Sequence, residues 1–266
     1  MPCCVEPAGN QIYDAQVDHF ERAGLSFPLR DEGPPDGEAV VLLHGFPQDA
    51  SAYDGVVPLL HARGLRTLVP TQRGYAASAR PRRRRNYATA ETTADVLALL
   101  NAADLARAHL VGHDWGAAPA WAMAAWHPDR VASLTVLSTP HPAAMVASFV
   151  TSSQGRKSWY MALFQLPVLP ERLASRTLHD SLIKSRLPTI YVERYVKAMA
   201  EPGALTAALS WYRGIPFSIR PPVGTVTVPT TYVWGRYDFA LGRAAAERTR
   251  RHVTGRYQFI ELTAGH

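Results

Sequence analysis

Three residues that can do chemistry stand where expected strands end: Asp114, Asp238 and His266. Asp114 is the centre of "GHDWGA" (112–117), between the apolar segment "LARAHLV" and the helical segment "APAWAMAAWH". A strand, a tight turn flanked by glycines and a helix form a nucleophile elbow, which presents one side chain at the edge of a sheet. Ser commonly occupies that position. A carboxylate there predicts direct attack by an oxygen anion on a saturated carbon instead of acyl transfer.

Asp238 and His266 lie where the partners of such a nucleophile are expected. Asp238 follows the expected strand "TTYVWG" and His266 follows "YQFIEL", which gives the chain order nucleophile, acid, histidine. In such a triad the acid orients the histidine, which activates water. Taken singly, Asp114 could be a helix N-cap, Asp238 a turn residue and His266 a terminal histidine. Their joint occurrence in this order favours a triad.

The segment "HGFP" (44–47) supplies a loop beside this site. His44 directly follows an expected buried strand, so we expect it to be structural and give it no role in proton transfer. The backbone N–H groups of Phe46 and Trp115 are predicted to form an oxyanion hole for a tetrahedral intermediate.

The elements that would position these residues alternate along the chain. Expected strands lie within residues 24–33, 38–45, 65–75, 109–114, 131–139, 230–238 and 257–262. Expected helices lie within residues 54–64, 89–104, 118–127 and 242–252. This alternation predicts an α/β fold, with a mostly parallel sheet and helices on both faces.

The pattern changes between about residues 141 and 222, where aromatic helical segments punctuated by proline replace the alternation. The change predicts a helical cap inserted into a core made of residues 1–140 and 223–266. Ligands of open α/β sheets bind at the carboxyl ends of the strands, so the cap is expected to close a pocket there.

Composition narrows the class of protein. The chain has 266 residues, 47% of them hydrophobic, with no secretory signal and no apolar run of membrane-spanning length. Adjacent Cys3 and Cys4 make a poor disulfide, so a soluble, cytoplasmic protein is expected. Zinc-ligand clusters, phosphate loops and dinucleotide-binding turns are missing from the sequence, so neither a metal nor a cofactor is expected.

The net charge is +6, and "RPRRRR" (80–85) is the densest run of positive charge. We interpret this run as a solvated loop, with a site for an acidic partner as the alternative, and we expect no nucleic-acid binding.

Five motifs together resemble the epoxide hydrolases of the α/β-hydrolase fold: "HGFP" (44–47), "RGYAAS" (73–78), "GHDWGA" (112–117), "WGRYD" (234–238) and the final "AGH". The resemblance covers nearly the whole chain, although "GHDWG" alone also fits the related haloalkane dehalogenases. It implies Asp114 as nucleophile, with Asp238 and His266 completing the triad.

The expected cap carries the part of the resemblance that separates the two families. "SWYMALFQLP" (158–167) and "ALSWYRG" (208–214) are similar to the segments that hold the ring-opening tyrosines of epoxide hydrolases, which places those roles on Tyr160 and Tyr212. Taken singly, either tyrosine could simply fill a core. An apolar substrate pocket is expected to be lined by Trp115, Trp159, Phe164, Trp211 and Phe217.

The resemblance implies hydrolysis of a small hydrophobic epoxide by water, through an ester on Asp114. A haloalkane dehalogenase and a non-catalytic ligand-binding protein are the alternatives, because a fold does not prove a function. The family continues through a further helix after the position of His266, so this chain is expected to lack the final helix. The sequence leaves the particular epoxide and the oligomeric state open.

Overall fold

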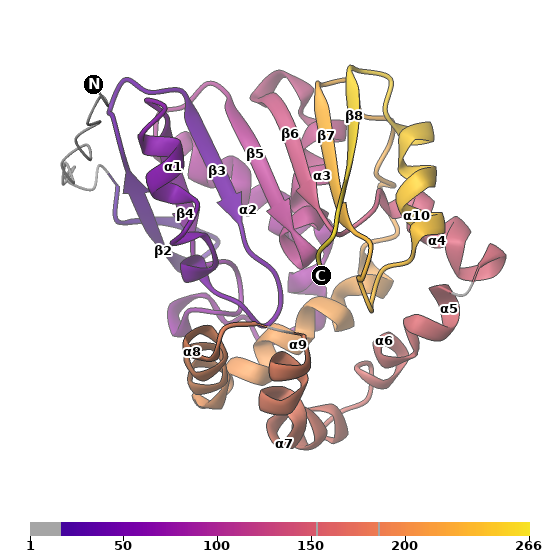
Figure 1. The fold of residues 1–266 in the computed structure, drawn as a ribbon. Coiled ribbons are helices and arrows are strands. Elements are labelled where there is room, and N and C mark those ends of the chain that lie inside the picture. The colour runs from indigo at the N-terminus through magenta and orange to yellow at the C-terminus, as the bar shows by residue number, and fades with distance from the viewer. Residues whose placement is uncertain (1–16, 153, 186) are drawn as a thin grey trace, which may run out of the picture.

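A single mixed sheet forms the centre of the molecule (Figure 1). The computed structural model describes residues 17–152, 154–185 and 187–266, and within them eight strands follow the order β1-β2-β4-β3-β5-β6-β7-β8. The pairs β1–β2 and β2–β4 are antiparallel, and the pairs from β4 to β8 are parallel. The bounds are β1 His19–Arg22, β2 Leu25–Glu32, β3 Ala39–Leu43, β4 Arg66–Pro70, β5 Ala108–His113, β6 Val131–Leu137, β7 Thr230–Gly235 and β8 Tyr257–Leu262.

The burial of the strands changes across the sheet. All residues of β3 ("AVVLL") and β4 ("RTLVP") are buried, as expected for central parallel strands covered on both faces. In β5, by contrast, buried residues alternate with half-buried ones, and no residue of β8 is fully buried. The predicted α/β class is confirmed, and complete burial is confined to the two inner strands β3 and β4.

Strand β1 is absent from the elements predicted by sequence. It joins β2 through a tight turn at Ala23 and Gly24, which have φ angles of +51° and +74°. Positive φ angles at both central residues suit a two-residue hairpin. Alanine seldom adopts such a conformation, and this hid the turn from a reading of the sequence.

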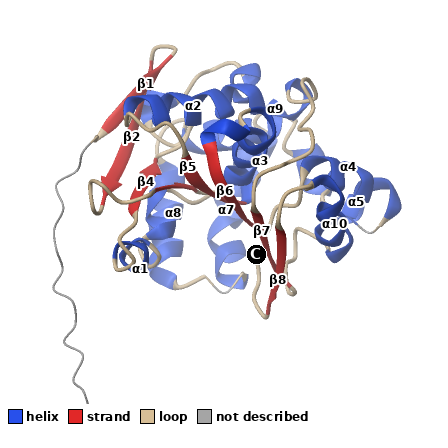
Figure 2. Ribbon diagram, turned by 90° about the horizontal axis from the view of Figure 1, so that it is seen from above, coloured by secondary structure: helices blue, strands red, loops and turns tan. Residues whose placement is uncertain are grey.

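Helices cover both faces of the sheet (Figure 2). Helices α2 and α3 pack against each other on one face, α1 lies on the opposite face, and α3 contacts β5 and β6. The bounds in the core are α1 Val57–His61, α2 Thr89–Ala102, α3 Ala117–Trp126 and α10 Arg243–Arg248.

A helical insertion, which we define as residues 142–217, separates β6 from β7 and lies at the carboxyl ends of the strands (Figure 1). Its helices are α4 Pro142–Thr151, α5 Gln154–Lys157, α6 Trp159–Leu163, α7 Leu169–Lys184, α8 Thr189–Ala200 and α9 Ala204–Gly214, followed by a 3₁₀ turn at Ile215–Phe217. Buried side chains of α7, α8 and α9 form a hydrophobic cluster with Tyr75 and Tyr87 of the core. This cluster fixes the insertion to the sheet.

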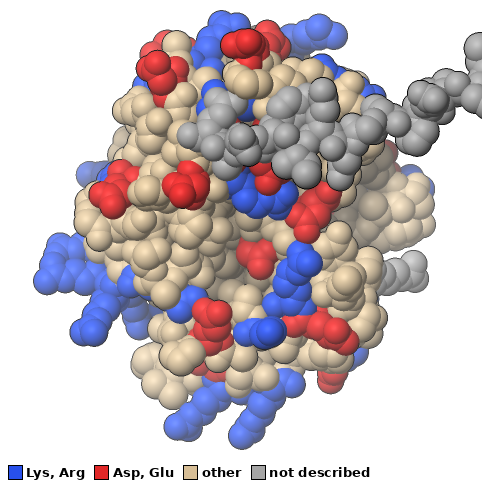
Figure 3. All heavy atoms as spheres, turned by 90° about the vertical axis from the view of Figure 1, so that its left-hand side faces the viewer, with Lys and Arg blue, Asp and Glu red and all other residues tan. Residues whose placement is uncertain are grey.

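The arginine run lies on the surface. Arg82–Arg85 are exposed, and within the described residues none of the four forms an ion pair, whereas Arg80 donates to the carbonyls of Gly74 and Tyr75. Figure 3 shows that Lys and Arg side chains project from the left edge and the bottom of one face of the molecule. Arg82–Arg85 are solvated, as the sequence predicts, whereas the Arg80 side chain is largely buried and forms an ion pair with Glu201.

Two further expectations concern what the described residues contain. None of their helices is both long enough and apolar enough to cross a membrane. The same residues hold no group of three or more His, Cys, Asp or Glu side chains suited to a metal ion. Cys3 and Cys4 lie outside the described residues.

Candidate active site

The turn after β5 presents Asp114 at the carboxyl edge of the sheet. Asp114 has a φ of +49°, and the 3₁₀ turn Asp114–Gly116 leads directly into α3. A Cβ atom at Gly116 would lie 2.1 Å from the carbonyl oxygen of Leu43, so this tight turn requires glycine. The strained conformation of Asp114 is typical of a nucleophile elbow.

The structure brings Asp114, Asp238 and His266 together. The Nδ1 atom of His266 lies 2.8 Å from Oδ2 of Asp238, and its Nε2 lies 3.3 Å from Oδ2 of Asp114. The other oxygen of Asp238 accepts hydrogen bonds of 2.8 Å from the backbone N–H groups of Ala240 and Leu241. Asp238 therefore has a fixed orientation, and the imidazole bridges two carboxylates.

The loop after β3 completes the surroundings of Asp114. The N–H of Phe46 donates to Oδ1 of Asp114 at 2.8 Å. The close approach depends on Gly45, where an added Cβ would lie 2.4 Å from the Cβ of Asp114. Trp115, the other predicted donor, belongs to the elbow turn itself. The Phe46 N–H thus points at the carboxylate on which an oxyanion would form.

The opposite charges of His266 and its two carboxylate neighbours shift the pKa values of His266 and Asp114. Burial alone would lower the pKa of His266, but hydrogen bonds and negative charge from Asp114 and Asp238 raise its pKa to about 10. Burial opposes ionisation of Asp114, yet hydrogen bonding and positive charge from His266 hold the pKa of this carboxyl below its usual value. At neutral pH the resting site is therefore an imidazolium between two carboxylates.

His113 and Gln48 also belong to the site, although sequence reasoning missed them. The Oε1 atom of Gln48 accepts from the Gly45 N–H at 3.4 Å and lies 3.0 Å from Nδ1 of His113, which must therefore donate. The ring of His113 lies 5.3 Å from that of His266, and burial lowers the pKa of His113 to about 4, so it is neutral. His113 belongs to "GHDWGA" and Gln48 directly follows "HGFP", but the sequence does not show where either side chain points.

His44 is tied to the backbone, in keeping with its expected structural role. Its Nε2 accepts from the N–H of Gln72 at 3.2 Å, and its Nδ1 lies 3.2 Å from the carbonyl oxygen of Gly45. The side chain is fully buried, and burial lowers its pKa to about 4. A neutral imidazole in these bonds holds the loops after β3 and β4 together.

Tyr160 of α6 and Tyr212 of α9 meet over the elbow. Their ring centroids are 5.9 Å apart, and the Tyr212 ring lies 4.8 Å from that of Trp115 and 5.9 Å from that of Phe46. Burial raises the pKa of both phenols, and the negative charge of Asp114 raises it further. Both tyrosines are therefore protonated at neutral pH. Phe164, with its ring 4.8 Å from that of Tyr212, belongs to the same aromatic cluster.

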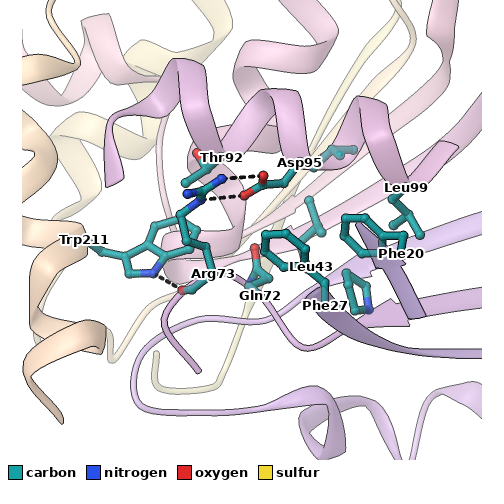
Figure 4. Close-up of a pocket in the computed structure, with 11 residues that line it drawn as sticks. Phe20, Phe27, Leu43, Gln72, Arg73, Thr92, Asp95, Leu99 and Trp211 are labelled. Atoms are coloured by element: carbon teal, nitrogen blue, oxygen red, sulfur yellow. Dashed lines mark hydrogen bonds and ion pairs between the residues drawn. The ribbon is translucent and has the colours of Figure 1, made fainter. Parts of the chain in front are cut away.

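Trp211 has a different position from the one predicted. It is 2% exposed, and its indole N–H donates to the carbonyl of Arg73 at 2.8 Å, beside the ion pair of Arg73 with Asp95 (Figure 4). The small pocket shown there contains neither Asp114, Asp238 nor His266. Trp211 packs behind Trp115, at a ring distance of 5.9 Å, and anchors α9 to the core.

Trp159 and Phe217 are not brought into the aromatic cluster. Trp159 is 65% exposed and Phe217 is 51% exposed. Successive residues of a helix point about 100° apart, so the inward orientation of Tyr160 turns Trp159 toward solvent. These two side chains therefore lie apart from the other aromatics, and their place in an apolar substrate pocket stays a prediction. Of the five predicted aromatics, Trp115 and Phe164 contact the tyrosines.

Comparisons with known proteins show the family to which the chain belongs. A family model described as "alpha/beta hydrolase fold" matches residues 38–266. The chain is 34% identical over 253 residues to the AB hydrolase superfamily protein YfhM of Bacillus subtilis (strain 168), which covers 91% of this chain and 88% of that protein. It is 32% identical over 247 residues to epoxide hydrolase 3 of Xenopus tropicalis, which covers 87% of this chain and 66% of the relative.

A solved structure shows the same fold. Epoxide hydrolase A from Mycobacterium thermoresistibile matches with a TM-score of 0.80 at 24% sequence identity, over 93% of this chain and 91% of that one. The chain therefore belongs to the α/β-hydrolase fold family, and epoxide hydrolases are among its relatives.

Proposed function

We propose that the protein is an epoxide hydrolase that converts a small hydrophobic epoxide and water to a vicinal diol. The observation that carries the proposal is a carboxylate at the elbow together with two phenols whose rings contact each other, one of them packed on the elbow residue Trp115. A nucleophilic anion and a proton donor on opposite sides of a strained ring are what ring opening requires. The insertion would act as the cap that holds the phenols and excludes water.

In the first step, the carboxylate of Asp114 attacks a ring carbon. A bond forms between that carbon and a carboxylate oxygen, the carbon–oxygen bond of the ring breaks, and the released alkoxide takes a proton from Tyr160 or Tyr212. The raised pKa of each phenol means that the proton is present at neutral pH. The product of this step is an alkyl ester on Asp114.

In the second step, His266 acts as the base. Formation of the ester removes the negative charge of Asp114, which is one of the two carboxylates that raise the pKa of His266. The pKa of the imidazole falls, so the imidazolium gives up its proton, which restores the tyrosine ionised in the first step. The neutral ring can then take a proton from water, while Asp238 keeps the ring oriented. Water adds to the ester carbonyl, and the Phe46 N–H stabilises the oxyanion. The bond between the carbonyl carbon and the diol oxygen then breaks, the imidazolium protonates that oxygen, and the Asp114 carboxylic acid returns a proton to His266 as the carboxylate is regenerated.

The tyrosine pair supports an epoxide in preference to a haloalkane. A departing halide needs no proton, whereas an alkoxide is a strong base that does. The aromatic cluster of Trp115, Phe164 and the two tyrosines further supports an apolar substrate.

Single-turnover hydrolysis in water labelled with oxygen-18, with enzyme in excess, tests the proposal. Styrene oxide, an aliphatic epoxide and a fatty-acid epoxide serve as substrates. The two-step route puts the label into the peptide that contains Asp114 and leaves the diol unlabelled, because the diol keeps a carboxylate oxygen. Label in the diol contradicts the ester route. Halide release from haloalkanes without diol formation would indicate a dehalogenase, and binding without turnover a ligand-binding protein.

A further inference from the structure

Gln154 is a buried amide that the proposed reaction does not use. It begins α5 in the insertion and is 1% exposed. Its Nε2 donates to the carbonyl of Ala240 and to the hydroxyl of Ser158, both at 2.8 Å. Its Oε1 accepts from the N–H of Gly242 at 2.7 Å. Both amide hydrogens and the amide oxygen therefore form hydrogen bonds, two of them with the loop after β7 and one with Ser158 of the insertion.

Toward the core, Gln154 holds the loop that orients the acid of the triad. Its bonds to Ala240 and Gly242 lie on either side of Leu241. The N–H groups of Ala240 and Leu241 are the donors to Oδ1 of Asp238. The position of these donors, and hence the direction of the Asp238 carboxylate, depends on a side chain that comes from the insertion.

Toward the insertion, Gln154 holds the start of the helix that carries a phenol. Ser158 is 4% exposed and immediately precedes α6, and Tyr160 lies two residues further along. The Ser158 hydroxyl accepts from the same Nε2 that donates to Ala240. One amide group therefore connects the element that holds Tyr160 to the loop that holds Asp238.

We propose that Gln154 is a positioning residue that couples the ring-opening side of the site to its hydrolytic side. The proposal rests on the function proposed above. Loss of the amide would leave the Ala240 carbonyl and the Gly242 N–H without their partner in a buried setting, so the loop would shift to recover hydrogen bonds. A displacement of about 1 Å at a catalytic group can cost about 100-fold in rate.

The pKa of His266 measures whether Gln154 holds the loop that orients Asp238. The groups that face its imidazole are the carboxylates of Asp114 and Asp238, the neutral ring of His113 and, beyond the carboxylates, the phenol of Tyr160. If the loop shifts and Asp238 moves away, His266 loses part of the negative charge that raises its pKa. The pKa of His266 should then fall, both in the resting protein and in the ester.

The test compares Gln154→Met with Gln165→Met. Gln165 is also an insertion glutamine, but its amide donates to carbonyls within the insertion, at Tyr212 (2.7 Å) and Met161 (3.4 Å).

Rapid quench and intact-mass spectrometry give the rates of ester formation and clearance across pH. In substrate-free protein, NMR gives the titration of His266. We expect Gln154→Met to slow ester clearance roughly 10- to 100-fold. It should also move to lower pH both the NMR titration of His266 and the pH dependence of clearance. The Gln165→Met protein should keep the His266 titration.

Ser158→Ala separates the two directions, because it cuts only the bond toward α6. It should slow ester formation several-fold and leave the pH dependence of clearance unchanged. A folded Gln154→Met protein with the His266 titration and clearance rate of the unaltered protein would overturn the proposal. If Gln154→Met does not fold, unchanged ester formation in Ser158→Ala overturns the coupling instead. If no epoxide reacts at all, the proposed function fails, and the NMR titration still decides the role of Gln154.

Discussion

The functional groups on the two sides of the proposed active site differ in their immediate contacts. On the sheet side, Asp114 and Asp238 accept hydrogen bonds from backbone N–H groups, and His266 lies between them. On the insertion side, Tyr160 and Tyr212 lie in ring contacts with each other and with neighbouring aromatics. Hydrogen bonds fix distance and angle closely, whereas ring packing tolerates small sliding movements. The difference suggests that the sheet fixes the chemistry and that the insertion adapts to the substrate.

The largest expected effect comes from removing the anion on the sheet side. Asp114→Asn keeps the shape of the side chain and tolerates positive φ, but it cannot attack carbon. We expect turnover to fall by at least about 10³-fold, with no ester detectable by intact-mass spectrometry. Circular dichroism should show an unchanged fold. Diol production near the original rate would show that the chemistry is not fixed by this carboxylate.

Removal of the base should separate the two steps. With His266→Gln, Asp114 can still open the ring, but nothing takes the proton from water, so the protein should gain the mass of one epoxide and keep it. Asp238→Asn should slow clearance less severely, because it misorients the histidine without removing it. An absence of adduct in His266→Gln, in protein shown to bind the substrate, would contradict the assignment of His266 to the second step.

The insertion side should show graded losses. Either Tyr160→Phe or Tyr212→Phe leaves one phenol to protonate the alkoxide, so each should lose part of the rate. The double variant should lose about 10²- to 10⁴-fold, the usual size of general acid assistance. Ester formation, measured under single-turnover conditions, is the affected step, and clearance should change little. Equal activity of the double variant and the unaltered protein would move the dehalogenase alternative ahead.

The two sides should also differ in their response to pH. Ester formation should be flat from about pH 6 to pH 9, because the pKa of Asp114 is lowered and the pKa values of both phenols are raised. Clearance should rise with pH, because it needs neutral His266. Its midpoint should lie below the value of about 10 for the resting imidazole, since the ester carries no charge. Stopped-flow measurement of both phases checks this, and a midpoint at or above 10 would rule out loss of the Asp114 charge as the trigger.

The smallest expected effect concerns the exposed aromatics. Trp159→Ala and Phe217→Ala remove side chains that face mostly solvent, so kcat/KM should stay within about twofold. Trp115→Ala is the contrasting variant, because Trp115 contacts Tyr212 and should affect ring opening. A large loss of kcat/KM in Trp159→Ala or Phe217→Ala would show that the insertion moves closer to the sheet when substrate binds than it lies in this structure.

The same contrast explains which predictions the sequence could support. Asp114, Asp238 and His266 each follow a strand, and parallel strands bring their carboxyl ends to one edge, so a linear pattern predicts their meeting. Asp114 carries the additional signature of flanking glycines. These three residues of the sheet side were therefore predictable, whereas His113 and Gln48 were not.

The insertion side was predictable only in part. Its tyrosines were assigned by resemblance, but the direction of neighbouring aromatics depends on which helix face meets the core. Trp211 shows this. It directly precedes Tyr212 in an aromatic helical segment and was therefore expected in the pocket, yet its indole N–H donates to the backbone carbonyl of Arg73. On the sheet side, the pairing of His113 with Gln48 joins the end of β5 to the loop after β3, and no periodicity reveals such a contact.

The place of the insertion between β6 and β7 also affects how the protein folds. Leu134 pairs with Thr230 across the whole insertion, so β7 can join the sheet only after that long intervening segment has been brought into a closed loop. Asp238 and His266 follow β7 and β8, whereas Asp114 precedes the insertion. During synthesis from the ribosome, the elbow therefore emerges well before its partners, and long-range strand pairing of this kind is slow. Recovery of activity after denaturation should accordingly lag behind recovery of helical and sheet signals.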